Sequence, residues 1–210
     1  MVSDSSLFNS AEANPYLSFV CAMSQQNLTF PILYRSWTPP AHPTYNCTVV
    51  EACRATTADL RIFSSIEIGE VWLKDTLIGG SLRCNNPVKY VWREAKSTFP
   101  DQTISCVVSI GAGIKGVLDM KRPLDTTHFN ILHDIATDCE ITSDDIANQL
   151  STTPGVYFRL NVDQGLQNVG STQCEELAAV HMHTVQYLKL HAVDQKVARL
   201  VRVLVGPSGV

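Results

Sequence analysis

The stretch NNPVKYVWREAKSTFPDQTISCVVSI, residues 85–110, decides the fold that the sequence predicts. Its Asn-Asn-Pro opening favours a helix start, because proline fits the first helical turn, where its missing N–H is not needed. Apolar side chains then recur at helical spacing, at Val88, Val91, Trp92, Ala95 and Phe99. After Pro100, residues 103–110 form an unbroken apolar run, which is typical of a parallel strand covered on both faces. Helix, turn and strand make half of an α/β unit, so we expect an α/β fold with a mostly parallel sheet flanked by helices.

Hydrophobic periodicity predicts further elements on both sides of this stretch. Strands are expected at 17–23, 32–36 and 157–162, the first two around a polar turn at 24–27. Helices are expected at 48–58, 127–138, 143–150 and 193–205, and another should carry Leu177, Val180, Thr184 and Leu188 on its apolar face. Capping patterns, Thr142…Asp145 and Thr172…Glu175, are expected to start the helix at 143 and the helix that contains Leu177.

Composition excludes several function classes. The 210 residues are 45% hydrophobic and 17% charged, with a net charge of −4 and no basic run longer than Lys121–Arg122, so nucleic acid is not an expected partner. Apolar stretches such as 104–110 are far shorter than the roughly 20 residues of a membrane-spanning helix. The first ten residues contain no lysine or arginine, unlike a signal peptide. Seven cysteines at irregular spacing indicate reduced thiols, and we expect a cytoplasmic protein.

Two motifs suggest a cofactor or a metal, and neither has the context that it needs. Gly111-Ala-Gly113-Ile-Lys-Gly116 follows the predicted strand and matches the glycine pattern of dinucleotide-binding folds. That pattern requires a helix at the third glycine, and Pro123 would cut such a helix to about two turns. His181 and His183 lie two positions apart on a predicted helix, so they point to nearly opposite sides. We therefore expect no cofactor and no metal.

A search for a nucleophile is equally negative. No Gly-x-Ser-x-Gly elbow occurs, and the nearest glycine-serine sequences are Gly79-Gly80-Ser81 and, in the expected tail, Gly206-Pro-Ser-Gly209. His128 and His133 have acidic neighbours, Asp125 and Asp134, but they lie on an ordinary amphipathic helix and are expected to be solvated. No catalytic residue is assigned.

Residues 77–88, LIGGSLRCNNPV, nevertheless resemble a known family. They are similar to the second catalytic motif of the patatin-like phospholipases, in which Asp-Gly-Gly or Asp-Gly-Ala precedes Asn-Asn-Pro. Further segments resemble that family in the right order, from about residue 17 to 204: VCAMS at 20–24, PILYRS at 31–36, EACRAT at 51–56, SIGAG at 109–113 and GVYFRLNVDQGL at 155–166. The resemblance, closest to fungal members, implies a three-layer fold with C-terminal helices and a Ser–Asp dyad that hydrolyses acyl esters of lipids.

The chain departs from the family pattern at the residues that carry out catalysis in the family. The glycine-rich loop and the serine elbow belong to the family's N-terminal half, which precedes the matched region, and the aspartate position falls on Gly79. Asp75 lies four residues earlier, and Leu60 stands where family members usually have proline. We therefore expect residues 17–205 to form an incomplete patatin-like domain, with a loosely attached segment at 1–16 and a tail at 206–210.

Three functions compete on these residues. The favoured one is a truncated or degenerate acyl hydrolase that is inactive as it stands. The second is a non-catalytic module that binds lipid, a membrane surface or a protein, including a partner chain that covers an exposed sheet edge. The third retains hydrolysis through an unusual pair, with Asp75 as the base and Ser81 as the nucleophile.

Overall fold

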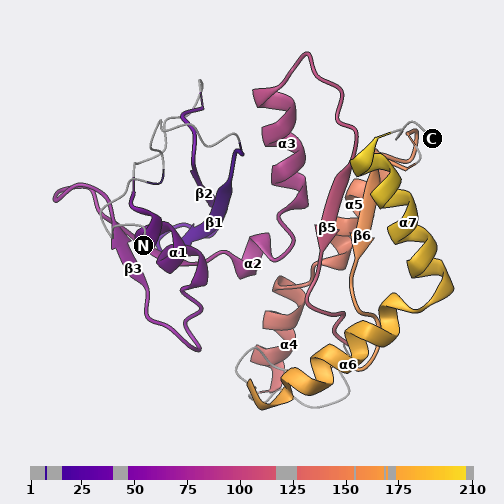
Figure 1. The fold of residues 1–210 in the computed structure, drawn as a ribbon. Coiled ribbons are helices and arrows are strands. Elements are labelled where there is room, and N and C mark those ends of the chain that lie inside the picture. Colours follow the sequence, from indigo (N-terminus) through magenta and orange to yellow (C-terminus); the bar gives the residue numbers. More distant parts are fainter. Residues whose placement is uncertain are drawn as a thin grey trace. The chain divides into compact units, whose positions relative to one another are not determined.

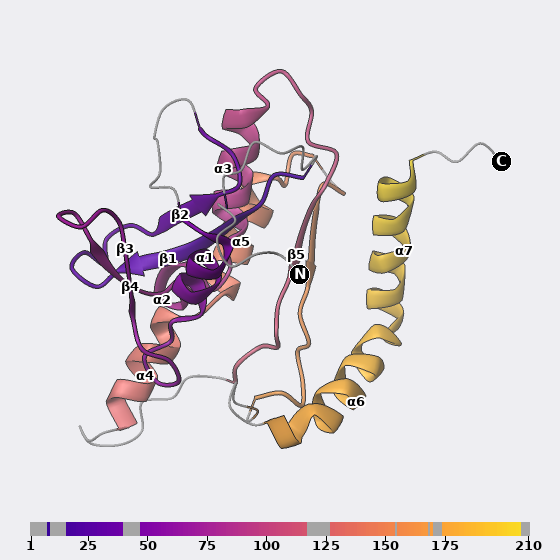
Figure 2. The same cartoon turned by 60° about the vertical axis from the view of Figure 1, so that its left-hand side comes forward.

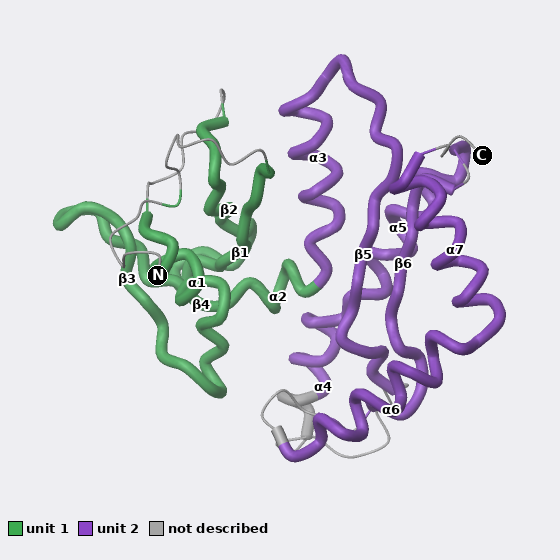
Figure 3. The backbone as a smooth tube through the Cα atoms, in the orientation of Figure 1, with its two compact units in different colours: residues 1–85 green, residues 86–210 purple. Residues whose placement is uncertain are grey.

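The computed structural model describes residues 8, 16–39, 47–116, 127–153, 155–167, 169 and 174–206. The chain divides into two compact units, Met1–Asn85 and Asn86–Val210 (Figure 3). The incomplete domain predicted over 17–205 spans both units. Apart from Phe8, Tyr16 and Gly206, the predicted N-terminal segment and tail lie outside the described residues.

The first unit is a four-stranded antiparallel sheet with one helix packed on it (Figure 1). Its elements are β1 (Phe19–Ser24), β2 (Ile32–Arg35), α1 (Val49–Thr57), β3 (Ile66–Ile68), β4 (Asp75–Gly79) and the single-turn helix α2 (Ser81–Cys84). The strand order is β2-β1-β4-β3. Thr48 caps α1 in a capping box with Glu51, which fixes the helix start. Ala52 and Ala55 of α1 then pack on Ala22 and Leu77 of the sheet, and all four are at most 1% exposed.

The second unit places helices on both faces of a parallel strand pair (Figure 2). Its elements are α3 (Val88–Thr98), β5 (Val107–Ile110), α4 (Thr127–Ala136), α5 (Glu140–Gln149), β6 (Tyr157–Leu160), the 3-10 turn η1 (Cys174–Glu176), α6 (Leu177–Leu188) and α7 (His191–Val205). Helices α3 and α5 lie on one face of the pair and α7 on the other. The buried cluster of this unit joins Val88, Val107, Ile146 and Leu150.

The mixed α/β class is confirmed, but the prediction of a mostly parallel sheet is wrong. Three of the four strand pairings, β1–β2, β1–β4 and β3–β4, are antiparallel. Short turns join β1 to β2 and β3 to β4, and such turns can only make antiparallel hairpins. A parallel pair needs a long crossover, and β5 and β6, which are joined through α4 and α5, form such a pair.

Strand β5 is also shorter and less buried than predicted. It begins at Val107 rather than at residue 103. Val107 is 6% exposed, whereas Val108 and Ile110 on the opposite face are 38% and 77% exposed. The expectation of cover on both faces is therefore wrong, because α7 contacts β6 in this unit and leaves these two side chains open.

Most predicted helices and strands are confirmed with small shifts at their ends, but one predicted helix start is wrong. Helix α5 begins at Glu140, three residues before the predicted start, and its N-cap Cys139 makes no side-chain cap. The Thr142…Asp145 pattern therefore lies inside the helix. Helix α6 begins after Glu176, which caps it without a side-chain bond, and Thr172 lies outside the described residues. In the described part of the chain, no helix is both long and apolar enough to cross a bilayer.

Candidate functional site

The motif that resembles the acyl hydrolases forms the turn between β4 and α2. Gly79 ends β4 and donates its N–H to the carbonyl of Ala58 at 2.8 Å. A side chain added at Gly79 would begin 3.3 Å from main-chain atoms of residues 56, 58 and 59. One added at Gly80 would begin 2.6 Å from the carbonyl oxygen of Cys21. The two glycines thus let this turn pack closely against the main chain of β1 and of the segment at the end of α1.

Asp75 and Ser81, the alternative catalytic pair, lie at opposite ends of β4. Asp75 is the first residue of the strand and accepts a hydrogen bond from the Ser24 hydroxyl at 2.7 Å. Ser81 follows the strand and opens α2. Four strand steps of about 3.3 Å separate Asp75 from Gly79, so the pair is more than about 10 Å apart. A general base must lie within about 3 Å of the proton that it takes, so this geometry does not support direct catalysis by the pair.

Two buried thiols lie beside this turn. Cys21 and Cys84 are 7% and 8% exposed, and their side chains share a hydrogen bond. That hydrogen bond, together with burial, raises the pKa of Cys21 far above its usual range. Burial likewise raises the pKa of Cys47 to about 11. Because the thiolate is the nucleophile, Cys21 and Cys47 are poorly suited to covalent chemistry at neutral pH.

The second asparagine of the motif has a structural function in the second unit. Asn86 is 5% exposed, and its amide nitrogen donates to the carbonyl of Cys139 at 3.1 Å. Its amide oxygen accepts from the Val88 N–H at 3.3 Å and from the Ser109 hydroxyl at 3.1 Å. One side chain therefore ties the start of α3 to β5 and to the start of α5.

A polar cluster lies at the carboxyl ends of β5 and β6, where open α/β sheets place their binding sites. Arg159 Nη2 lies 2.5 Å from Glu140 Oε1, and Arg159 Nη1 donates to the Ser109 hydroxyl at 2.9 Å. Asn161 donates to Glu140 at 2.9 Å and accepts from the Gly113 N–H at 2.7 Å. This network links both strands, the start of α5 and the loop after β5.

Glu140 and Arg159 each stabilise the charged form of the other. Burial alone would raise the pKa of Glu140, but the hydrogen bond and charge of Arg159 outweigh it and hold that pKa below its ordinary value. Burial raises the pKa of the neighbouring Cys139 thiol, which lies 3.2 Å from Arg159 Nη2. Within the described part of the chain, Arg159 Nε is buried without a hydrogen-bond partner. The cluster therefore offers an ion pair and a neutral thiol, and neither is a free base or nucleophile.

The glycines after β5 make room for neighbouring side chains. A side chain at Gly111 would begin 2.3 Å from Asn161 Oδ1, and Gly113, at φ +116°, would meet Leu166. Residues 111–116 are a loop, and the helix that a dinucleotide motif requires is not found within them. Residue Pro123 lies outside the described residues.

The histidines singled out by the sequence lie apart in the second unit. His181 and His183 are both on α6, and the His183 ring contacts Gly165. His133 lies on α4, with Nδ1 3.7 Å from the Asp134 carboxylate, which also binds Lys115 at 2.6 Å. The side chain of His128 and all of Asp125 lie outside what the structure describes. No group of three potential metal ligands occurs among the described residues.

Sequence reasoning missed an apolar surface at one end of the antiparallel sheet. The pairing of Ser24 with Leu77 brings the end of β1 beside the start of β4, so the β1–β2 and β3–β4 turns lie at the same end (Figure 2). Five exposed apolar side chains form this hairpin-tip surface: Leu28 (45% exposed), Phe30 (76%), Val71 (78%), Trp72 (95%) and Leu73 (62%). Three apolar residues in a row between Glu70 and Lys74 were the available signal in the sequence.

Comparison with known proteins gives no relative: no protein-family model matches the chain, and neither does any curated protein.

Proposed function

We propose that the chain is a catalytically inactive relative of the patatin-like lipid acyl hydrolases. The proposal rests on the order of the similar segments along the sequence, above all LIGGSLRCNNPV at 77–88. The observation that carries the inactivity is Gly79 at the position of the dyad aspartate, in a turn closely packed against residues 56–59. Asp75, the alternative base considered from the sequence, is at the other end of β4 and already binds Ser24.

The expected loss of rate is large. Removal of a general base alone lowers a rate by about 10²–10⁴-fold. Ser81 additionally opens a four-residue helix directly after β4, and this strand-to-helix turn lacks the strained backbone of a nucleophile elbow, because no described residue other than glycine has a positive φ. We therefore expect the purified chain to hydrolyse esters no faster than a variant without the Ser81 hydroxyl.

Hydrolysis of short-chain and long-chain p-nitrophenyl esters tests this proposal. The full chain is compared with Ser81→Ala and with Ser105→Ala, which removes a hydroxyl from an exposed site in the second unit. Equal rates for all three proteins, at the background of the buffer, are expected. A rate clearly above background that Ser81→Ala abolishes and Ser105→Ala preserves would overturn the inactivity.

The hairpin-tip surface favours a second candidate function, the binding of a lipid bilayer surface without catalysis. Trp72 is 95% exposed between Val71 and Leu73, and tryptophan suits the boundary between lipid and water because one edge of its ring is polar. The one lysine of this tip, Lys74, lies 3.5 Å from Glu67. Binding to the bilayer would therefore depend mainly on apolar contact and not on attraction to anionic lipid. A partner chain that covers an exposed sheet edge stays a further prediction.

Sedimentation with zwitterionic phosphatidylcholine vesicles tests the second candidate. Full burial of a large apolar side chain contributes about 1.5–3 kcal/mol, so Trp72→Ala should weaken binding by about ten- to a hundredfold. Phe63→Ala is the matched control, because Phe63 is 54% exposed and precedes β3 at the opposite end of the sheet. Equal binding by both variants, or no binding by the full chain, would rule out this surface as a bilayer contact.

A further inference from the structure

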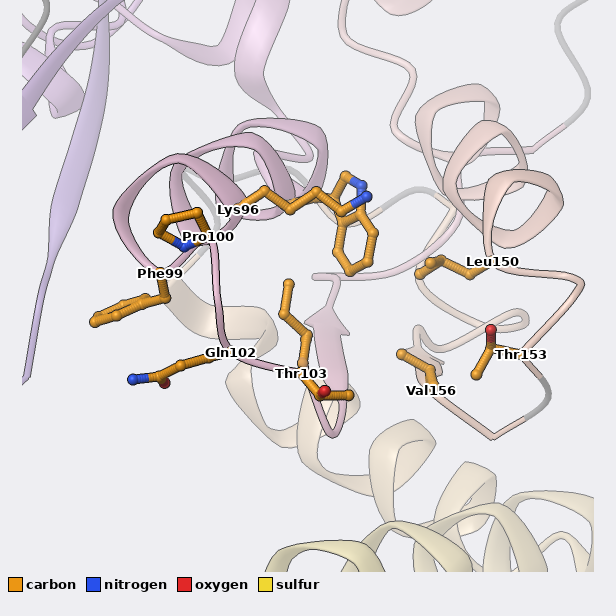
Figure 4. A pocket seen from close by; sticks show the side chains of 10 residues that line it. Lys96, Phe99, Pro100, Gln102, Thr103, Leu150, Thr153 and Val156 are labelled. Atoms are coloured by element: carbon orange, nitrogen blue, oxygen red, sulfur yellow. The ribbon is translucent and has the colours of Figure 1, made fainter.

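A pocket of about 420 Å³ lies within the second unit, at the carboxyl end of α3. Phe99 and Pro100 line one side, and Leu150 and Val156 line the opposite side, so the pocket lies between the end of α3 and the segment that joins α5 to β6 (Figure 4). Its volume falls in the range of about 300–1,000 Å³ that small-molecule sites occupy. The pocket is thus large enough for a compact organic ligand.

The inner wall of the pocket is the surface of the core. Trp92, Ile104 and Val156 line it and pack against the buried cluster that contains Leu150. These side chains are held in place by residues on several elements, so the apolar wall is formed before any ligand arrives. A ligand with an apolar body would remove this wall from water.

One charged side chain lines the pocket. Lys96 lies across it, with Nζ 4.4 Å from the centroid of the Trp92 ring, and the remaining polar lining is neutral. Among the described residues, no carboxylate pairs with Lys96 and none lines the pocket. The Lys96 ammonium is therefore available to an incoming anion.

The carboxyl ends of α3 and α5 carry partial negative charge and therefore repel an anion that approaches Lys96. Each helix carboxyl end carries about half a negative charge, and its effect fades within one turn and is screened by solvent. Lys96 lies in the last turn of α3 and carries a full, mobile charge. A carboxylate in direct contact with Lys96 gains more from this attraction than it loses through repulsion by the two more distant helix ends.

We propose that this pocket is a binding site for a small amphipathic monocarboxylate, whose apolar body lies against Trp92, Ile104 and Val156 and whose carboxylate binds Lys96. The site is in the second unit and is independent of the β4 turn, so it stands or falls separately from the proposed loss of hydrolysis.

A series of three isosteric probes tests the proposal: phenylbutyrate, phenylbutanol and phenylbutylamine. Their binding to the full chain is followed by NMR through the indole N–H signals of its tryptophans. Trp92 lines the pocket, whereas Trp37 and Trp72 lie in the first unit and report nonspecific binding. Phenylbutyrate should shift the Trp92 signal alone, saturate at one site and bind about fivefold more tightly than phenylbutanol, because an exposed ion pair contributes up to about 1 kcal/mol. Phenylbutylamine should bind most weakly.

Lys96→Met keeps the aliphatic side chain and removes the charge, so it should abolish the advantage of phenylbutyrate over phenylbutanol. Lys89→Met is the matched control, because Lys89 is on the same helix with Nζ 5.1 Å from the Tyr90 ring but does not line the pocket. Equal affinity for the acid and the alcohol, tighter binding of the amine, unchanged affinity in Lys96→Met, or parallel shifts of all three tryptophans would each overturn the proposal.

Discussion

Replacement of Asn86 by alanine should destabilise the second unit by about 3 kcal/mol. The side chain is 5% exposed and makes hydrogen bonds to the Cys139 carbonyl, the Val88 N–H and the Ser109 hydroxyl. A net loss of about 1 kcal/mol for each bond gives this magnitude. Ser109 keeps its hydrogen bond from Arg159, which offsets part of this loss of stability. The Cys139 carbonyl loses a hydrogen-bond partner, which increases the loss.

Urea denaturation followed by far-UV circular dichroism measures this change through the shift of the transition midpoint. Asn85→Ala is the control, since Asn85 is the exposed neighbour in the same Asn-Asn-Pro sequence, and it should cost less than about 1 kcal/mol. If Asn86→Ala loses no more stability than Asn85→Ala, the structural function assigned to Asn86 is refuted.

Three further predictions follow from the packing and the charges. Gly80→Ala should lower the midpoint of thermal unfolding, because the added methyl group would meet the Cys21 carbonyl oxygen at 2.6 Å and such overpacking costs about 1–3 kcal/mol. An unchanged midpoint in calorimetry would contradict this. Arg159 holds the pKa of Glu140 below its ordinary value of 4.5, so the stability that this pair contributes is present above that pH and is lost as the pH falls below it. The difference in unfolding free energy between the chain and Glu140→Gln should therefore shrink in acid. A difference that stays constant with pH would count against the ion pair. Iodoacetamide followed by peptide mass spectrometry should label the exposed Cys53 well before the buried Cys21, and equal rates would argue against the buried thiol.

The elements that the sequence predicted well are those with a strong local signal. Helix α3 follows from the proline at its start and from Val88, Trp92 and their neighbours at helical spacing. Strand pairing was predicted poorly, because it depends on partners far away in the chain. The short strands β3 and β4 were missed altogether, since three and five residues around a turn leave little periodicity to detect.

The candidate site shows the same division between local and distant information. The assignment of Gly79 to the aspartate position is a prediction from the sequence alone, because it rests on local spacing from Asn-Asn-Pro. The ion pair of Glu140 with Arg159 and the contacts of Asn86 with Cys139 and Ser109 join residues 19 to 53 positions apart. No periodicity or spacing encodes such contacts. The hairpin-tip surface likewise depends on the register that places two turns at one end of the sheet.

Intact-mass spectrometry after treatment with a fluorophosphonate tests the proposed inactivity most directly, because the reagent captures an activated serine without any turnover. The unmodified mass of the full chain is the result that we predict, since the turn that carries Ser81 has no strained residue and Asp75 lies at the far end of β4. A stoichiometric adduct that Ser81→Ala and Asp75→Asn both abolish would contradict the proposed inactivity.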